Sequence, residues 1–319
     1  MARCLRPLFL NGNSYNCGSC LNCRINYTSK WQLRLLYELN SWSGATFVTL
    51  TYDDEHIPKN YELKKIHLRN FLKRVRSKLK YNNICLWSDF PIVGNSGNTY
   101  SPIFRYYCAG EYGMHPRDGI KGHERPHFHC ILFGVDYYNP NHRQIIIDSW
   151  KYCDPNQFDI SRGVKCALQP VNIDTIGYVT GYVRKKITGD KAVQAYGNRK
   201  RPFNICSHGL GLQLALRQKD LLSKGYTYTH NGKRVGLPRY FREKLGFEID
   251  YSTSDSQKVI KDSFDYINGL YKKQFPDLLS TPEAEEKRFQ RWYDSNNWTV
   301  SEKIMEAFNK RNSLLNKEL

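Results

Sequence analysis

Two histidines separated by one residue, in the segment RPHFHCILFG, are the side chains of this sequence best suited to chemistry. Side chains alternate between the two faces of a β-strand, so a strand here would hold His127 and His129 on one face and turn Phe128 towards a core on the other. Imidazole is a common metal ligand, and the pair therefore predicts a metal site. The alternative is a pair of histidines on a half-exposed strand that binds nothing.

A carboxylate in an earlier segment supplies a third candidate ligand. Glu111 ends a predicted strand in the run FRYYCAGEYG. Two imidazoles and one carboxylate with open coordination positions suit Mg²⁺ or Mn²⁺, because these cations prefer oxygen, accept imidazole and also bind phosphate. A solvated glutamate at a strand end is the alternative.

The segment VNIDTIGYVTGYVRKKITG predicts a helix that Asn172 or Asp174 caps. At 100° per residue, one apolar stripe forms for burial, made of Ile176, Val179, Val183 and Ile187. Tyr178, Tyr182 and Lys185 form a second stripe, turned well away from the first. The tyrosines are therefore candidates for function, and a surface tyrosine pair at helical spacing is the alternative.

Three motifs in this order resemble a known family. The FVTLTY strand (47–52), the His-Phe-His strand and the Tyr-x-x-x-Tyr helix followed by lysine are similar to the HUH endonucleases that initiate rolling-circle replication. The match is best with the replication initiators of the Microviridae, single-stranded DNA phages, and the gokushovirus type in particular. The likeness extends over residues 1–248 and includes the cysteine cluster CGSCLNCR and the segment GLPRYFREKLG.

The resemblance implies a role for each candidate. It makes His127 and His129 metal ligands with Glu111 as the third, and Tyr178 and Tyr182 nucleophiles that form a 5′-phosphotyrosine. A tyrosine hydroxyl has an ordinary pKa of about 10, so it needs a nearby cation or base to attack at neutral pH.

Lys185 and Lys186 both match the basic position after the second tyrosine. Helical geometry favours Lys185 as the residue that stabilises the phenolate, because Lys186 is rotated a further 100° from the tyrosine face.

The charge of the chain points to a polyanionic partner. Lys and Arg number 48 against 30 Asp and Glu, a formal net charge of +18. Residues 251–319 carry equal numbers of basic and acidic side chains, so the excess lies in the first 250 residues. Tyrosine, of which there are 23, can also stack on single-stranded bases. The candidate DNA-binding residues, for each of which a solvated face is the alternative, are Lys73, Arg74, Arg76, Lys78, Arg184, Lys186, Arg199, Lys200 and Arg201.

The order of predicted elements indicates an α+β fold with a central, mainly antiparallel sheet flanked by helices. We expect a Cys-rich segment at 1–40, a nicking domain at 41–250 and a charge-neutral helical tail at 251–319. Predicted helices cover 28–41, 62–79, 141–150 and the tyrosine segment, and predicted strands cover 46–52, 103–111 and 126–134.

Four cysteines near the start of the sequence predict a structural Zn²⁺ site. Cys17, Cys20 and Cys23 follow at intervals of three, and Cys4 is the fourth candidate ligand. An iron–sulfur cluster requires a fourth cysteine and following proline that are absent from the expected spacing. Ordinary reduced thiols remain the other alternative.

The sequence thus predicts a DNA-nicking and strand-transfer enzyme that starts phage rolling-circle replication. Its expected partners are single-stranded origin DNA, double-stranded replicative-form DNA and the host helicase and DNA polymerase. A plasmid initiator, relaxase or transposase shares the chemistry, and a non-enzymatic, zinc-stabilised nucleic-acid-binding protein is the alternative of another class. No apolar run approaches the length of a membrane span, and LRPLFL is too short and proline-broken for a secretion signal, so we expect the bacterial host cytoplasm.

Overall fold

The structure is a computed structural model that describes residue 4 and the ranges 8–10, 13–18, 20–82, 92–93, 99–100, 102–116, 120, 124–153, 155–185, 190–223, 226–230 and 233–247. Its described residues fall into two compact units. One unit runs from Leu35 to Leu214, and the other joins the segment up to Arg34 with the segment from Ala215 onwards.

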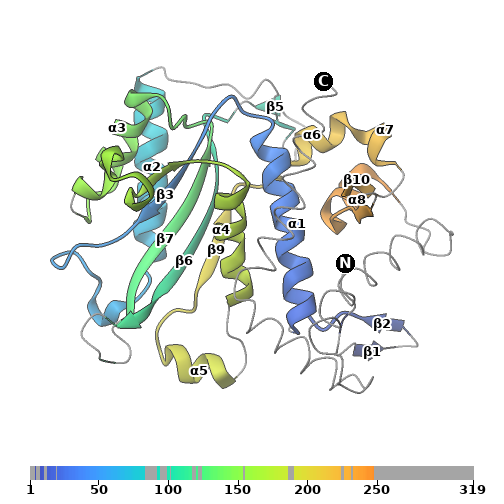
Figure 1. The fold of residues 1–319 in the computed structure, drawn as a ribbon, viewed down its shortest axis with the longest axis horizontal. Coiled ribbons are helices and arrows are strands. Elements are labelled where there is room, and N and C mark those ends of the chain that lie inside the picture. Colours follow the sequence, from blue (N-terminus) through green and yellow to red (C-terminus); the bar gives the residue numbers. More distant parts are fainter. Residues whose placement is uncertain are drawn as a thin grey trace. The chain divides into compact units, whose positions relative to one another are not determined.

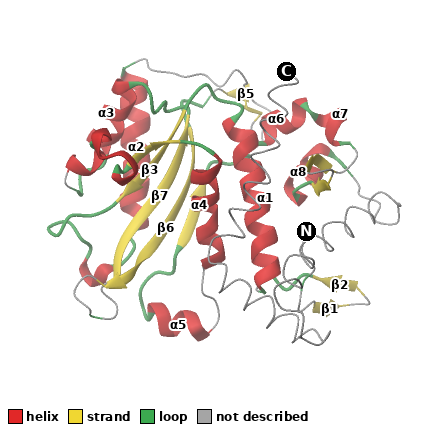
Figure 2. Cartoon of the chain, viewed as in Figure 1, coloured by secondary structure: helices red, strands yellow, loops and turns green. Residues whose placement is uncertain are grey.

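The first of these units is built on a five-stranded sheet (Figures 1 and 2). Its strand order is β8-β3-β7-β6-β9, and every pairing within it is antiparallel. The predicted α+β fold with an antiparallel sheet is therefore confirmed. The bounds of its strands are β3 (Ala45–Leu50), β6 (Arg105–Pro116), β7 (Glu124–Phe133), β8 (Leu168–Pro170) and β9 (Phe203–Cys206).

Two helices, α2 (Lys65–Tyr81) and α3 (Pro140–Ser149), cover one face of this sheet. Val48, Phe128, Cys130 and Leu132 point towards them and form the main apolar core with the buried side of α2. The other face carries the alternate residues of the same strands, and α4 (Ile173–Lys185) lies over β6 and β7 there. The sheet thus separates a purely structural face from a face that bears histidines.

Local sequence explains where α4 begins. The Asn172 Oδ1 accepts a hydrogen bond from the Thr175 backbone N–H at 2.8 Å, and the Thr175 hydroxyl accepts one from the Asn172 N–H at 2.9 Å. This reciprocal cap satisfies two donors that a helix start would otherwise leave unpaired. Of the two predicted caps, Asn172 is the correct one. Ile176 and Val179 are fully buried, as the apolar stripe predicts.

A buried ion pair ties the sheet to the end of α1 (Leu21–Leu39). Glu38 and Arg105 are almost inaccessible, and the Arg105 Nη1 lies 2.9 Å from the Glu38 Oε2. The same carboxylate accepts hydrogen bonds from the Trp42 indole at 2.8 Å and from the Gly211 N–H at 2.7 Å. These contacts satisfy the carboxylate, as a buried charge requires.

The remaining elements complete the two units. In the sheet unit they are η1 (Lys59–Tyr61), β4 (Ile92–Val93), β5 (Thr99–Tyr100), η2 (Pro155–Phe158), η3 (Ile160–Lys165) and α5 (Asp190–Tyr196). In the other unit, after α6 (Leu212–Arg217), they are β1 (Leu8–Leu10), β2 (Asn13–Tyr15), α7 (Lys219–Leu222), β10 (Tyr226–His230), β11 (Lys233–Gly236) and α8 (Arg239–Leu245).

The division differs from the predicted domain of residues 41–250, because residues 215–247 group with the start of the chain. The physical reason lies in α1 and α8: the Arg34 guanidinium lies 4.3 Å from the Trp31 ring centre and 3.9 Å from that of Tyr240. These contacts join segments about two hundred residues apart, which no local pattern reveals. The predicted tail, 251–319, lies outside the described residues.

The predicted elements all appear, with shifted ends. The helix predicted at 28–41 begins at Leu21, the strand predicted at 103–111 runs on to Pro116, and the strand predicted at 126–134 begins at Glu124. The extra length of β6 and β7 comes from their mutual pairing. In the part of the chain that the structure describes, no helix combines the length and apolarity needed to cross a bilayer.

Candidate metal and tyrosine site

Strand register brings the three predicted ligands together. Glu111 on β6 pairs directly with His127 on β7, and His129 pairs with Ala109 two positions before Glu111. Because side chains alternate along a strand, all three ligands point to the face that α4 covers.

The donor atoms converge on one point. The Glu111 Oε1 lies 2.7 Å from the His127 Nε2 and 3.2 Å from the His129 Nε2. One ligand atom from each residue lies within 4.8 Å of the other two. Separate segments of the sequence therefore supply a facial set of two nitrogens and one oxygen.

The other nitrogen of each imidazole is also occupied. The His127 Nδ1 lies 3.2 Å from the Arg125 carbonyl oxygen, and the His129 Nδ1 lies 3.0 Å from the Thr49 Oγ1. A carbonyl can only accept, so the Nδ1 of His127 carries a proton and its Nε2 is the nitrogen that can bind a cation. Partners of this kind fix the tautomer and the ring orientation of metal-binding histidines.

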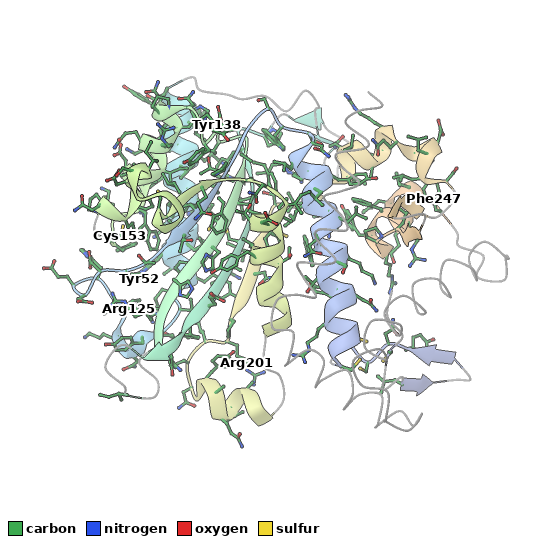
Figure 3. The ribbon with its side chains drawn as sticks, viewed as in Figure 1. Tyr52, Arg125, Tyr138, Cys153, Arg201 and Phe247 are labelled. Carbon is green, nitrogen blue, oxygen red and sulfur yellow. The ribbon has the colours of Figure 1, made fainter. Side chains whose placement is uncertain are left out.

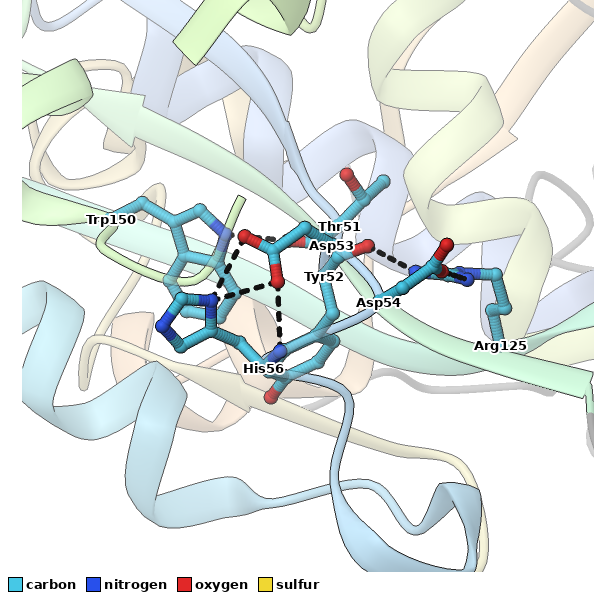
Figure 4. Close-up of polar contacts among 7 residues, drawn as sticks. All are labelled: Thr51, Tyr52, Asp53, Asp54, His56, Arg125 and Trp150. Atoms are coloured by element: carbon cyan, nitrogen blue, oxygen red, sulfur yellow. Dashed lines mark hydrogen bonds and ion pairs between the residues drawn. The ribbon is translucent and has the colours of Figure 1, made fainter. Parts of the chain in front are cut away.

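Arg125 is itself held in place by the loop that follows β3 (Figure 4). Its guanidinium donates to the Tyr52 carbonyl oxygen at 2.5 Å and pairs with the Asp54 carboxylate. In the same loop, the Asp53 carboxylate accepts from the His56 backbone N–H at 2.8 Å. The loop therefore fixes the backbone beside His127.

The electrostatics of the site favour a charged carboxylate. Burial of Glu111 opposes its ionisation, but hydrogen bonds from His127 and His129 outweigh burial and lower its pKa from 4.5 to about 2. Glu111 is therefore an anionic ligand at neutral pH.

Tyr178 on α4 lies against the ligand His129. The two rings meet edge to face, with centres 5.1 Å apart, and the tyrosine ring meets Phe47 in the same way at 6.1 Å. Phe47 in turn stacks on the His129 ring, with centres 5.8 Å apart and planes at 8°. Tyr178 remains 37% exposed, so solvent and a substrate can reach it.

The donor set fits the predicted divalent cation. An ionised carboxylate and two imidazole Nε2 atoms face one point, and neighbouring groups hold the Nδ1 atoms. Mg²⁺ or Mn²⁺ held by few protein ligands keeps further positions for water or phosphate oxygens.

Sequence reasoning missed three residues of this site. Phe47 and Thr49 sit two apart on β3, on the same face as His129, and the carbonyl of Arg125 precedes His127. Strand alternation in FVTLTY places Phe47 and Thr49 on one face, but pairing with β7 is a tertiary fact. Only that pairing shows which face meets the histidines.

The other predicted catalytic positions are less defined. Tyr182 and Lys185 belong to α4, but their side chains lie outside the described ones, as does that of Arg184. Lys186 lies outside the described residues altogether.

The two predicted basic clusters lie in different places. On α2, which covers the opposite face of the sheet, the Arg74 Nε donates to the Ser149 carbonyl at 2.8 Å and Lys78 pairs with Asp148 at 3.0 Å. Lys73 and Arg76 on the same helix are exposed, and the Arg76 guanidinium lies 4.9 Å from the Phe104 ring centre.

The second cluster borders the site. The Arg199 guanidinium pairs with Glu124 at the start of β7 and lies 4.4 Å from the Tyr112 ring centre. Lys200 and Arg201 are exposed, and Figure 3 shows Arg201 towards the same end of the sheet as Arg125. This cluster is the one on the substrate side.

The four predicted zinc ligands also come together, in the other unit. The Sγ atoms of Cys4, Cys17, Cys20 and Cys23 all lie within 4.8 Å of one another.

Comparison with known proteins agrees with this geometry. Residues 45–187 match the family model of the replication-associated protein ORF2, and this segment includes the three ligands and both tyrosines. No solved structure matches the chain significantly.

Three curated phage proteins match as well. Replication-associated protein VP4 of Bdellovibrio phage phiMH2K is 27% identical over 72% of this chain and 67% of its own length. Replication-associated protein ORF2 of Spiroplasma virus 4 is 26% identical over 79% and 76%. Replication-associated protein ORF4 of Chlamydia phage 1 is 26% identical over 72% of this chain but only 53% of its own length. The chain, through residues 45–187, belongs to the replication-associated protein ORF2 family and is related to replication-associated proteins of Microviridae-type phages.

Proposed function

We propose that this protein initiates rolling-circle replication of a phage genome by nicking single-stranded DNA through a tyrosine. The observation that carries the proposal is the convergence of Glu111, His127 and His129 on one point, with Tyr178 against His129. The replication-associated relatives support the same role.

The proposed reaction is a transesterification. The Tyr178 oxygen attacks a backbone phosphorus, the bond from phosphorus to the 3′-oxygen breaks, and the phenolic proton passes in net terms to that 3′-oxygen. The products are a 5′-phosphotyrosine and a free 3′-hydroxyl, so the phosphodiester energy is retained and ATP is not needed. Mg²⁺ or Mn²⁺ held by the three ligands would polarise the phosphate and stabilise the charge that develops on its oxygens.

The residues around the ligands prepare the site for this step. Thr49 and the Arg125 carbonyl orient the two imidazoles, while the Phe47 ring restrains His129 from the side. Such preorganisation matters because a nucleophile and its phosphate react efficiently only when held in near-attack geometry. Lys185 is the proposed partner of the tyrosine phenolate.

Tyr182 is the proposed second nucleophile. It follows Tyr178 by four residues on α4, and residues at this spacing share a helix face. One tyrosine can then hold the first 5′-end while the other cuts the regenerated origin. The 3′-hydroxyl would prime synthesis by the host polymerase behind the host helicase, in the bacterial cytoplasm.

The proposed DNA path follows the basic cluster next to the site. Lys200 and Arg201 are exposed, and Arg199 lies beside the start of β7. Contacts of Lys and Arg with phosphates give most of the sequence-independent affinity for DNA. Residues Lys73, Arg74, Arg76 and Lys78 cover the opposite sheet face, so they are better placed for the duplex replicative form than for the cleaved strand.

Covalent trapping tests the proposal without knowledge of the origin. The full chain is incubated with a pool of randomised single-stranded oligonucleotides and Mn²⁺, heated in detergent, and the DNA that stays attached is sequenced. We expect an adduct on one preferred sequence that EDTA abolishes. Mass spectrometry should place the linkage in the peptide spanning Ile173 to Arg184.

Matched variants sharpen the result. The Tyr178→Phe/Tyr182→Phe double variant should form no adduct while keeping its salt-sensitive DNA binding, and Tyr138→Phe, an exposed tyrosine outside the site, should behave as wild type. An adduct on any other tyrosine would overturn the assignment. DNA binding without any adduct from the wild-type protein would favour the non-enzymatic alternative.

A further inference from the structure

The segment before α1 has little apolar burial of its own. Strands β1 and β2 form a two-stranded hairpin in which Leu8 pairs with Tyr15, and these two side chains are 55% and 51% exposed. An isolated hairpin of this size is marginal in water. Something other than apolar packing has to hold the segment.

The buried groups at this place are sulfur atoms. Cys4, Cys20 and Cys23 are 5 to 6% exposed and form a cluster of their own, with Cys17 packed against it. The hairpin carries the chain from Cys4 back to Cys17, and the next two cysteines lie at the start of α1. Thus the cluster joins the hairpin to the helix.

The sulfur positions match one tetrahedral metal ion. The Cys4 and Cys20 Sγ atoms are 3.9 Å apart, and those of Cys17 and Cys23 are 4.0 Å apart. Bonds of about 2.3 Å from zinc to sulfur give tetrahedron edges of about 3.8 Å. A disulfide would require about 2.05 Å, well below both of these separations. An iron–sulfur cluster places several irons and sulfides between its cysteines and would hold them further apart.

The backbone is arranged around the sulfurs in a manner that suits thiolates. The Cys17 N–H donates to the Cys4 Sγ and the Cys20 N–H to the Cys17 Sγ, each at 3.3 Å. The chain turns between Cys17 and Cys20 through Gly18, whose φ of +71° a side chain rarely adopts. Hydrogen bonds from N–H groups to ligand atoms are typical of the outer shell of metal sites.

We propose that Cys4, Cys17, Cys20 and Cys23 bind one structural Zn²⁺ that fastens the β1–β2 hairpin to the start of α1. The site is closed, because four protein ligands leave no open position for substrate. It is separate from the catalytic cation in both ligand type and place in the chain.

Metal analysis of the full chain, purified and dialysed against EDTA, tests the proposal. We expect about one zinc per chain in the wild type, almost none in Cys17→Ser/Cys20→Ser, and about one in the matched control Cys153→Ala. The variant Glu111→Gln should also keep its zinc, which excludes the histidine site as the source. Iron in place of zinc, or zinc retained by the double cysteine variant, would overturn the proposal.

A second measurement needs no variant, in case the double variant fails to fold. Wild-type protein is treated with a mercurial that modifies thiols, and released zinc is measured with a chromogenic chelator. We expect about one zinc per chain, released as thiols react, with a fall in the melting temperature of the protein. Cobalt exchanged into the site should give the visible bands of a tetrahedral ion with sulfur ligands. Fully reactive thiols in well-folded protein without released metal would refute the site.

Discussion

The hydroxyl of Thr49 offers the sharpest test of the site, because it touches a ligand rather than the cation. Its Oγ1 lies 3.0 Å from the His129 Nδ1. When the Nε2 of His129 binds a cation, the proton sits on Nδ1 and the Thr49 hydroxyl accepts a hydrogen bond from it. Replacing Thr49 with Val keeps the branched shape that suits a strand and removes only this acceptor.

The expected effect follows from the position of Thr49. Loss of a partner that orients a metal-binding histidine typically costs 10- to 100-fold in metal affinity or activity. At about 1.4 kcal/mol per tenfold change, this is about 1.4 to 2.8 kcal/mol of binding free energy. The His129 side chain is only 4% exposed, so water does not readily replace the lost partner. We therefore expect Mn²⁺ to bind Thr49→Val about 10- to 100-fold more weakly.

The assay is a titration of the full chain with Mn²⁺, with free Mn²⁺ measured by electron paramagnetic resonance. Thr49→Ser, which keeps the hydroxyl, should restore most of the affinity. Thr46→Val is the matched control: Thr46 lies on the same strand, faces the other side of the sheet and donates to the Val135 carbonyl at 2.6 Å. It should lose stability, by about 1 to 3 kcal/mol, but keep its Mn²⁺ affinity.

Unchanged Mn²⁺ affinity in Thr49→Val would refute the role of Thr49 as the partner of a metal-bound imidazole. Equal loss of affinity in Thr46→Val would show that the effect comes from disturbance of β3 as a whole. Loss in Thr49→Val and recovery in Thr49→Ser would support the proposed ligand set.

Three further predictions concern charge and packing. Glu111→Gln removes the ionised oxygen ligand and should weaken Mn²⁺ binding at least tenfold and abolish the covalent adduct, as titration and trapping will measure; a normal adduct would count against Glu111 as a ligand. Glu38→Gln leaves the Arg105 guanidinium buried without its counter-charge and should lower the free energy of unfolding by about 3 to 5 kcal/mol in urea denaturation. Gly134→Ala adds a Cβ at a φ of +86°, where it would lie 2.4 Å from the Trp42 ring, so we expect a clearly lower melting temperature; an unchanged one would contradict the packing at this turn.

Some features of this protein follow from local sequence alone. The spacing of His127 and His129 puts them on one face of any strand, and the spacing of Tyr178 and Tyr182 puts them on one face of any helix. Asn172 is one of two capping residues that local pattern offers for α4. Local periodicity and capping determine these features because they depend on residues within a few positions of each other.

Tertiary structure decided what those faces meet. Pairing of β6 with β7 set Glu111 opposite His127, and pairing of β3 with β7 brought Thr49 to His129. The choice between two basic segments was also tertiary, because α2 packs on the face away from the histidines. Register and packing join residues up to about a hundred positions apart, and no periodicity in the sequence records which partner a strand or helix will find.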